Sequence, residues 1–220
     1  MVVDAVRAGA TLVAMAEAGD PEVYLASSAE AARAYRDAKA PHALLGGEAG
    51  GLPLEGFDLG NSPAEWARTD LAGKTVVFGT TNGTRAASVC RGAERVCFGA
   101  FVNAAAAAEA ALAVATAAVK IVCAGSSGRF ALDDAVCAGF MVRELLKRGA
   151  EPEDSALAAA AIAKGYPDVE EMLRSSDSGR RLLKVGLEAD LHDCARLNVS
   201  TRVPTLARRS FTAERRLLAI

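Results

Sequence analysis

Short apolar runs alternate with amphipathic stretches along the first two thirds of the chain. Six runs are rich in β-branched and other apolar residues: MVVDAV (1–6), EVYLA (22–26), ALLG (43–46), KTVVFG (74–79), ERVCFG (94–99) and VKIVCAG (119–125). Runs of this length and composition predict buried strands of a parallel sheet. Each run precedes a helical pattern, except that ALLG precedes a long glycine-rich loop.

Between the runs, apolar residues recur at helical spacing. This spacing predicts helices over residues 8–18, 28–39, 82–91, 103–118 and 131–148. After Gly149 the pattern predicts nearly continuous helix through residue 196, followed by one short strand in NVSTRVP (198–204). The βα alternation indicates a three-layer α/β/α fold with a mostly parallel sheet, a mixed sheet being the alternative. We expect one domain over residues 1–220, or two α/β halves of about 1–100 and 101–220.

Composition limits the classes of partner. With 220 residues, 51 % of them hydrophobic, the chain can bury a sizeable core, and its formal charge of −2 gives no general attraction to nucleic acid or anionic membranes. It has no uninterrupted transmembrane-length apolar run and no leader-like start after Met1, so we expect a cytoplasmic protein. Five cysteines without a CxxC pair fit reduced core thiols. A homo-oligomer is compatible with the sequence.

The unusual polar residues follow the predicted strands. They are Asp4, Glu48, Asp58, the TTNGT segment (80–84), Asn103, Asp133 and Asp134. In an open α/β sheet, ligands bind at the carboxyl ends of the strands. We therefore expect these residues to converge on one edge and form an active site.

Their chemistry favours a hard cation. Mg²⁺ prefers carboxylate oxygens and completes its shell with water and substrate phosphate. The candidate metal ligands are Asp4, Glu48, Asp58, Asp133 and Asp134. An alternative is that Asp133 and Asp134 only stabilise a helix N-terminus and that Asp58 only caps a turn.

The TTNGT segment stands where a strand would lead into a helix. Free N–H groups and hydroxyls at such a junction can hold a phosphate or sulfonate, although an ordinary capped turn is the alternative. Arg7 could clamp the same anion in a bidentate manner, with Arg85 and Arg129 as competitors.

A second mechanism comes from CAGSSGR (123–129), in which Cys123 and Arg129 have the Cys-x5-Arg spacing of thiolate phosphatases. The histidine expected before the cysteine is Val122, and Phe130 replaces the hydroxyl residue after the arginine. We therefore interpret Cys123 as a buried strand-end thiol. A thiolate phosphatase and a non-catalytic small-anion-binding protein stay as alternatives.

Several of these motifs together resemble the 2-phosphosulfolactate phosphatase family: VVDAVRA, GGEAGGLPLEGFDLGNSP (46–63), TTNGT, GAFVNA and CAGSSGRFALDDAVCAG, with a weaker echo in SGRRL (178–182). The resemblance implies a Mg²⁺-dependent α/β phosphatase of the coenzyme M pathway, releasing phosphate from 2-phospho-3-sulfolactate. The long glycine-rich loop would then build the metal and substrate site.

The predicted site has three groups of residues. We expect catalytic roles for Asp4, Arg7 and Glu48, in addition to the metal ligands named above. Substrate binding is assigned to Asn61, Ser62, Thr81, Asn82, Gly83, Thr84, Asn103 and Arg129.

Overall fold

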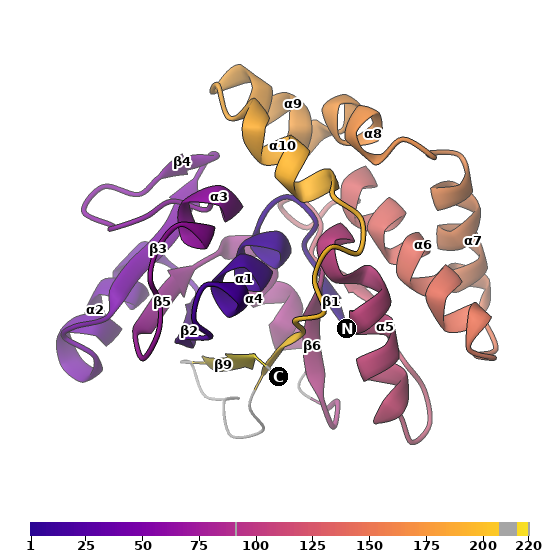
Figure 1. Cartoon of the computed structure of the whole chain (residues 1–220), viewed down its shortest axis with the longest axis horizontal. Helices are drawn as coiled ribbons and strands as arrows, with labels where there is room; N and C mark the ends of the chain where they lie inside the picture. The colour runs from indigo at the N-terminus through magenta and orange to yellow at the C-terminus, as the bar shows by residue number, and fades with distance from the viewer. Residues whose placement is uncertain (91, 207–214, 220) are drawn as a thin grey trace.

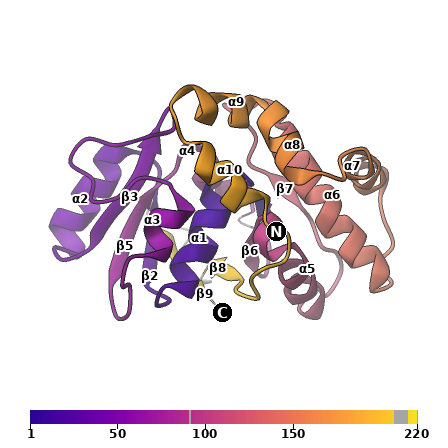
Figure 2. The same ribbon diagram turned by 45° about the horizontal axis from the view of Figure 1, so that its top comes forward.

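The computed structural model describes residues 1–90, 92–206 and 215–219, with the backbone alone at 81, 84 and 215–219. The described strands form one sheet in the order β4-β3-β5-β2-β9-β8-β6-β1-β7 (Figures 1 and 2). Their bounds are β1 (Val2–Val3), β2 (Glu22–Ala26), β3 (Leu44–Ala49), β4 (Leu52–Pro53), β5 (Thr75–Gly79), β6 (Val96–Gly99), β7 (Val122–Cys123), β8 (Pro204–Leu206) and β9 (Arg215–Ala219).

The sheet consists of two parallel blocks joined by antiparallel strands. In one block β5 pairs with β2 and β3, and in the other β1 pairs with β6 and β7. β8 and β9 pair with each other and connect the blocks through antiparallel contacts with β6 and β2. The mixed, mostly parallel sheet between helices confirms the predicted fold class.

Helices flank this sheet. Their bounds are α1 (Ala8–Glu17), α2 (Ala29–Lys39), α3 (Pro63–Ala67), α4 (Thr81–Val89), α5 (Ala104–Ala113), α6 (Leu132–Lys147), α7 (Asp154–Lys164), α8 (Val169–Ser175), α9 (Asp177–Lys184) and α10 (Glu188–Ala195), with a 3₁₀ turn η1 (Phe101–Asn103). Figures 1 and 2 show α8, α9 and α10 gathered together, and α9 lies against both of its neighbours. No described helix combines the length and apolar character needed to cross a membrane.

Several boundaries differ from the sequence-based expectation. α5 ends at Ala113 rather than residue 118, because residues 114–118 are exposed and burial does not stabilise a further turn. The expected long helix after Gly149 is four short ones, interrupted around Pro167, Ser176 and Gly186. The strand expected at 198–204 begins only at Pro204.

The glycine-rich segment is more ordered than a loop. β3 continues through Glu48 and turns back as β4, with Glu48 opposite Pro53. Gly46 is required because a Cβ there would lie 2.2 Å from the ring of Trp66, a fully buried side chain. Gly51, at φ +94°, occupies the left-handed region that favours glycine. The short turn thus places Glu48 at the carboxyl end of β3.

All five cysteines are free thiols, which agrees with the expected reduced state. Cys97, Cys137 and Cys194 are buried and Cys90 is partly buried. The prediction that Cys123 is buried was wrong: it ends β7 as expected, but its residue is exposed.

Candidate active site

A cavity of about 320 Å³ opens at the carboxyl ends of β1, β3 and β7. Sheet-end loops, the β3–β4 turn, α4, α6 and α9 all contribute to its wall. The described residues lining it are Asp4, Val6, Arg7, Glu48, Ala49, Gly50, Gly51, Asn61, Asn82, Gly125, Ser126, Ser127, Asp133, Asp134, Ser178, Arg181 and Leu182. Seven residues predicted for the site therefore share one cavity: Asp4, Arg7, Glu48, Asn61, Asn82, Asp133 and Asp134.

Asp4 lies just beyond β1 and is buried. Its Oδ1 accepts a hydrogen bond from the Ala8 N–H at 3.3 Å, at the start of α1. Burial, followed by repulsion from Asp133 and Glu48, raises the pKa of Asp4 to about 7, against the opposing effects of the Ala8 N–H and Arg7. The site thus holds a carboxylate whose charge the protein alone does not fully compensate.

Asp133 and Asp134 occupy the first turn of α6 and are also buried. Asp134 accepts from the Ala5 N–H at 2.8 Å and from the Gly125 N–H at 2.7 Å, so it ties the end of β1 to the loop after β7. Burial, then Asp133 and Asp4, raise the pKa of Asp134 well above its usual value. Burial also raises the pKa of Asp133, against a hydrogen bond from Ser178.

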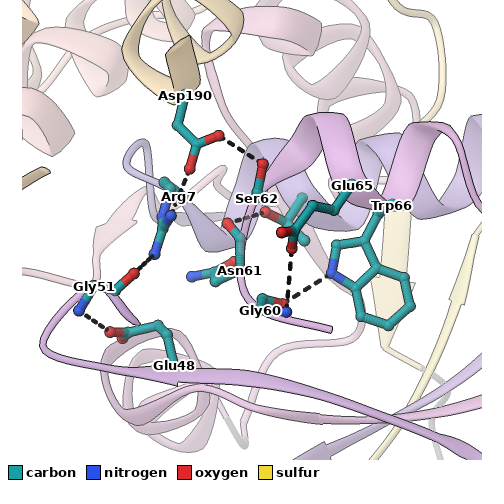
Figure 3. A network of polar contacts seen from close by, with 10 residues as sticks. Arg7, Glu48, Gly51, Gly60, Asn61, Ser62, Glu65, Trp66 and Asp190 are labelled. Carbon is teal, nitrogen blue, oxygen red and sulfur yellow. Dashed lines mark hydrogen bonds and ion pairs between the residues drawn. The ribbon is translucent and has the colours of Figure 1, made fainter. Parts of the chain in front are cut away.

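Arg7 joins three distant segments (Figure 3). Its Nη1 donates to Asp190 Oδ2 at 2.5 Å, and its Nη2 donates to the Gly51 carbonyl at 2.6 Å. The Ser62 hydroxyl donates to Asp190 Oδ1 at 2.6 Å, and the Gly51 N–H donates to Glu48 Oε2 at 2.7 Å. This chain of contacts fixes the turn that carries Glu48.

Asn61 is a polar residue with an unused acceptor. Its backbone carbonyl accepts from the Thr11 hydroxyl at 3.0 Å, and the residue is only 5 % exposed. The side-chain Oδ1 is buried and has no hydrogen-bond partner. Because unpaired buried acceptors are costly, this atom indicates that the cavity takes a polar ligand.

Two residues predicted for the site, one as a metal ligand and one as a substrate contact, have structural roles instead. Asp58 is exposed outside the cavity, and its Oδ2 accepts from the Leu45 N–H at 2.7 Å, which matches the turn-cap alternative. Asn103 is fully buried: it accepts from the Ala100 N–H and donates to the carbonyls of Phe98 and Arg202. Its amide is used to hold backbone segments together, so the structure does not support a substrate contact.

Ser62 does not line the cavity either, because its hydroxyl donates a hydrogen bond to Asp190. In the TTNGT segment, Asn82 lines the cavity and accepts from the Ser127 N–H at 3.3 Å. Gly83 allows close approach, since a Cβ there would lie 3.1 Å from Asp4 Oδ2. The side chains of Thr81 and Thr84 lie outside the described part of the structure.

The geometry argues against the thiolate alternative. Among the described residues that line the cavity, neither Cys123 nor Arg129 is present, and Arg129 is exposed. Desolvation, then the carboxylates of Asp134 and Asp133, raise the pKa of Cys123 to about 12. A thiol with this pKa is protonated at neutral pH and is a poor nucleophile.

Three site residues were missed by sequence reasoning: Ser178, Arg181 and Asp190. Ser178 and Arg181 line the cavity from α9, and the SGRRL echo was the signal that could have found them. Asp190 is 3 % exposed in α10, and its surrounding sequence carries no comparable signal. Its role becomes apparent only from its contacts in the folded chain, with Arg7 and Ser62.

The acids do not form a metal cage by themselves. Within the described residues, no group of three or more His, Cys, Asp or Glu side chains is arranged to hold a metal ion. Of the five candidate metal ligands, Asp4, Glu48, Asp133 and Asp134 line the cavity, whereas Asp58 does not. His42 and His192 are both exposed and do not line the cavity.

Comparison with known proteins identifies the family. The sequence model of the family described as 2-phosphosulpholactate phosphatase matches residues 1–209. Proteins named probable 2-phosphosulfolactate phosphatase from Deinococcus radiodurans and Thermus thermophilus are each 44 % identical over 208 residues, covering 94 % of this chain and 86 % of the relative. One from Caldicellulosiruptor saccharolyticus is 36 % identical over 203 residues, covering 89 % and 84 %. The chain belongs to the 2-phosphosulfolactate phosphatase family.

Proposed function

We propose that this protein is a Mg²⁺-dependent phosphatase that hydrolyses 2-phospho-3-sulfolactate to 3-sulfolactate and inorganic phosphate, a reaction that fits the coenzyme M pathway. The observation that carries the proposal is the cavity in which Asp4, Glu48, Asp133 and Asp134 meet two arginines. These residues come from distant parts of the chain, and the family to which the chain belongs is named for this activity.

The donor set suits Mg²⁺. This ion usually takes one or two carboxylates, several waters and substrate phosphate rather than a protein cage. Asp4 and Asp133 are buried, repel each other and have raised pKa values, which is the condition that a cation relieves. We assign these two as ligands, because both oxygens of Asp134 already accept backbone N–H groups.

Bound there, Mg²⁺ would neutralise phosphate charge and lower the pKa of a bound water. In the hydrolysis, a water oxygen forms a new bond to phosphorus while the ester P–O bond breaks. The proton lost by the water is balanced by the proton gained by the leaving alkoxide, which becomes the hydroxyl of 3-sulfolactate.

Glu48 is placed to position the attacking water or accept its proton. Its Oε2 is fixed by the Gly51 N–H, whereas within the described residues its Oε1 has no hydrogen-bond partner. Arg7 retains further N–H groups on the two nitrogens that hold Asp190 and Gly51, and these can donate to phosphate oxygens. Asn61 adds a neutral amide at the same wall.

Phosphate release from 2-phospho-3-sulfolactate, measured with Mg²⁺ and with EDTA, tests the proposal. We expect turnover that chelator abolishes and added Mg²⁺ restores. Turnover that persists in EDTA would contradict the metal assignment. Absence of turnover under all metal conditions, in protein shown to be folded, would instead support a small-anion-binding protein.

A further inference from the structure

The two arginines that line the cavity differ in what surrounds their charge. Arg7 is 4 % exposed and paired with Asp190. Arg181 is exposed, and within the described part of the chain it takes part in no ion pair. Arg181 is thus a cationic group of this cavity that no described carboxylate neutralises by direct contact.

Arg181 is nevertheless held in place. Its Nη2 donates to the Ser126 hydroxyl at 2.8 Å, and its Nε donates to the Asp177 backbone carbonyl at 3.4 Å. Both acceptors are neutral, and a guanidinium has five N–H donors, so three remain available. The Arg181 charge also interacts electrostatically with Asp133, since Arg181 is among the groups that oppose the rise in the pKa of Asp133.

Helix α9 directs this side chain towards the cavity. Ser178, Arg181 and Leu182 line the cavity and have the i, i+3, i+4 spacing of one helix face. The helix sits close against α8, since a Cβ at Gly179 would lie 1.8 Å from the Leu173 carbonyl oxygen. Close packing of this kind restricts rotation of α9, the helix that carries Arg181.

The neighbouring arginine provides a contrast. Arg180 is exposed, pairs with Asp177 at 2.5 Å and is not among the described lining residues. Two adjacent arginines on one helix therefore face different surroundings, one neutralised at the surface and one left charged at the cavity. Arg180 is the matched control for any test of Arg181.

The charges of the cavity indicate what Arg181 binds. Four carboxylates line the cavity. The proposed function places the metal ion and the phosphate beside Asp4, Glu48 and Arg7. A further anionic group on the substrate would be repelled by the carboxylates unless it had its own cation. A guanidinium fork matches the oxygens of a carboxylate or a sulfonate.

We propose that Arg181 recognises the second anionic group of the substrate, a sulfonate or a carboxylate, and so selects small phosphomonoesters that carry one. This inference rests on the proposed function and adds the residue that determines specificity. It places phosphate chemistry at the sheet edge and recognition of the remaining charge on α9.

Three substrates of decreasing charge test it: 2-phospho-3-sulfolactate, 2-phospholactate, which lacks the sulfonate, and isopropyl phosphate, which lacks the carboxylate as well. We would measure kcat/KM for each with the wild type, Arg181→Ala, Arg181→Lys and Arg180→Ala, in Mg²⁺. For Arg181→Ala we expect a loss of roughly 10- to 100-fold on 2-phospho-3-sulfolactate and little loss on isopropyl phosphate. Arg181→Lys should recover part of the loss, and Arg180→Ala should behave as wild type.

The intermediate substrate identifies the anion. A loss that disappears with 2-phospholactate assigns Arg181 to the sulfonate, and a loss that persists there assigns it to the carboxylate. An equal loss on all three substrates, or no loss on any, overturns the inference. If the wild type hydrolyses none of them, the proposed function fails; if only the pattern of Arg181→Ala is wrong, that function stands and the inference fails.

Discussion

The cavity has two walls of opposite character. The sheet-edge wall, formed by Asp4, Asp133 and Asp134, is buried and negatively charged, and burial raises the pKa of each of these carboxyl groups. The helical wall, formed by α9, presents the exposed Arg181, which forms no ion pair with any residue that the structure describes. Burying like charges costs free energy that a bound cation would offset, whereas an exposed guanidinium costs little. Under the proposed function, the first wall carries the chemistry and the second recognises the substrate.

The buried Arg7–Asp190 ion pair ties the segment after β1 to α10, which packs against α9, so its loss should have the largest effect. Asp190→Asn leaves the buried Arg7 guanidinium without its direct ion-pair partner, and we expect destabilisation of about 3–5 kcal/mol. Denaturant unfolding measures this free energy. The control is Asp177→Asn, which breaks the exposed pair with Arg180 and should cost less than about 1 kcal/mol. Equal effects of the two variants would show that the Arg7–Asp190 pair does not stabilise the fold in this way.

Asp4→Asn tests the sheet-edge wall. It keeps the side-chain shape but removes a proposed metal ligand, so kcat/KM should fall by about 10²–10³-fold. Its melting temperature in EDTA at pH 8 should not fall, because a repelled carboxylate has been removed. Asp58→Asn, an acid outside the cavity, is the control and should retain most activity. A similar loss in both variants would contradict the division between lining and structural acids.

Stability should depend on pH because the folded-state pKa of Asp4 is about 7, above the usual 3.8. A group whose pKa is higher in the folded state than in the unfolded state makes its full contribution to stability below the unfolded-state pKa. That contribution is lost as the pH rises through the folded-state pKa. We therefore expect the metal-free melting temperature to fall by on the order of 5–10 °C between pH 5 and 8. Added Mg²⁺ should stabilise more at pH 8 than at pH 5. A flat profile that Asp4→Asn leaves unchanged would contradict the expectation.

Glu48→Gln sharpens the role of the β3–β4 turn. The glutamine oxygen can still accept from the Gly51 N–H, so stability should change by less than about 0.5–1 kcal/mol. Activity should nevertheless fall by about 10- to 100-fold, since the charge that we propose orients the water is lost. Melting temperature and Mg²⁺-dependent rate are measured on one preparation, with exposed Glu55→Gln as control. Unchanged turnover would remove Glu48 from the mechanism.

The smallest effect is expected at Cys123, which belongs to neither wall. Its raised pKa and its position outside the cavity predict that Cys123→Ser changes kcat/KM by less than about twofold. The measurement is phosphate release in Mg²⁺ after the variant is shown to be folded. A loss of several orders of magnitude would revive the thiolate mechanism.

The sheet-edge wall could be predicted because its geometry follows from the repeating βα pattern. Parallel strands bring their carboxyl ends to one edge, so Asp4, Glu48 and Asp134 converge without knowledge of side-chain packing. The same reasoning failed for Asp58 and Asn103, which also follow strands. Position along the chain does not reveal whether a polar side chain faces the cavity or satisfies nearby backbone groups.

The sequence by itself determined the α/β class, the family and the acidic edge, because apolar periodicity and strand ends are local features. Only the tertiary structure decided how α8, α9 and α10 close over that edge, and with them the places of Arg181 and Asp190. The Arg7–Asp190 pair joins residues 183 positions apart. Such a contact depends on packing between helices that no local pattern encodes, and it is this packing that gives the cavity its second wall.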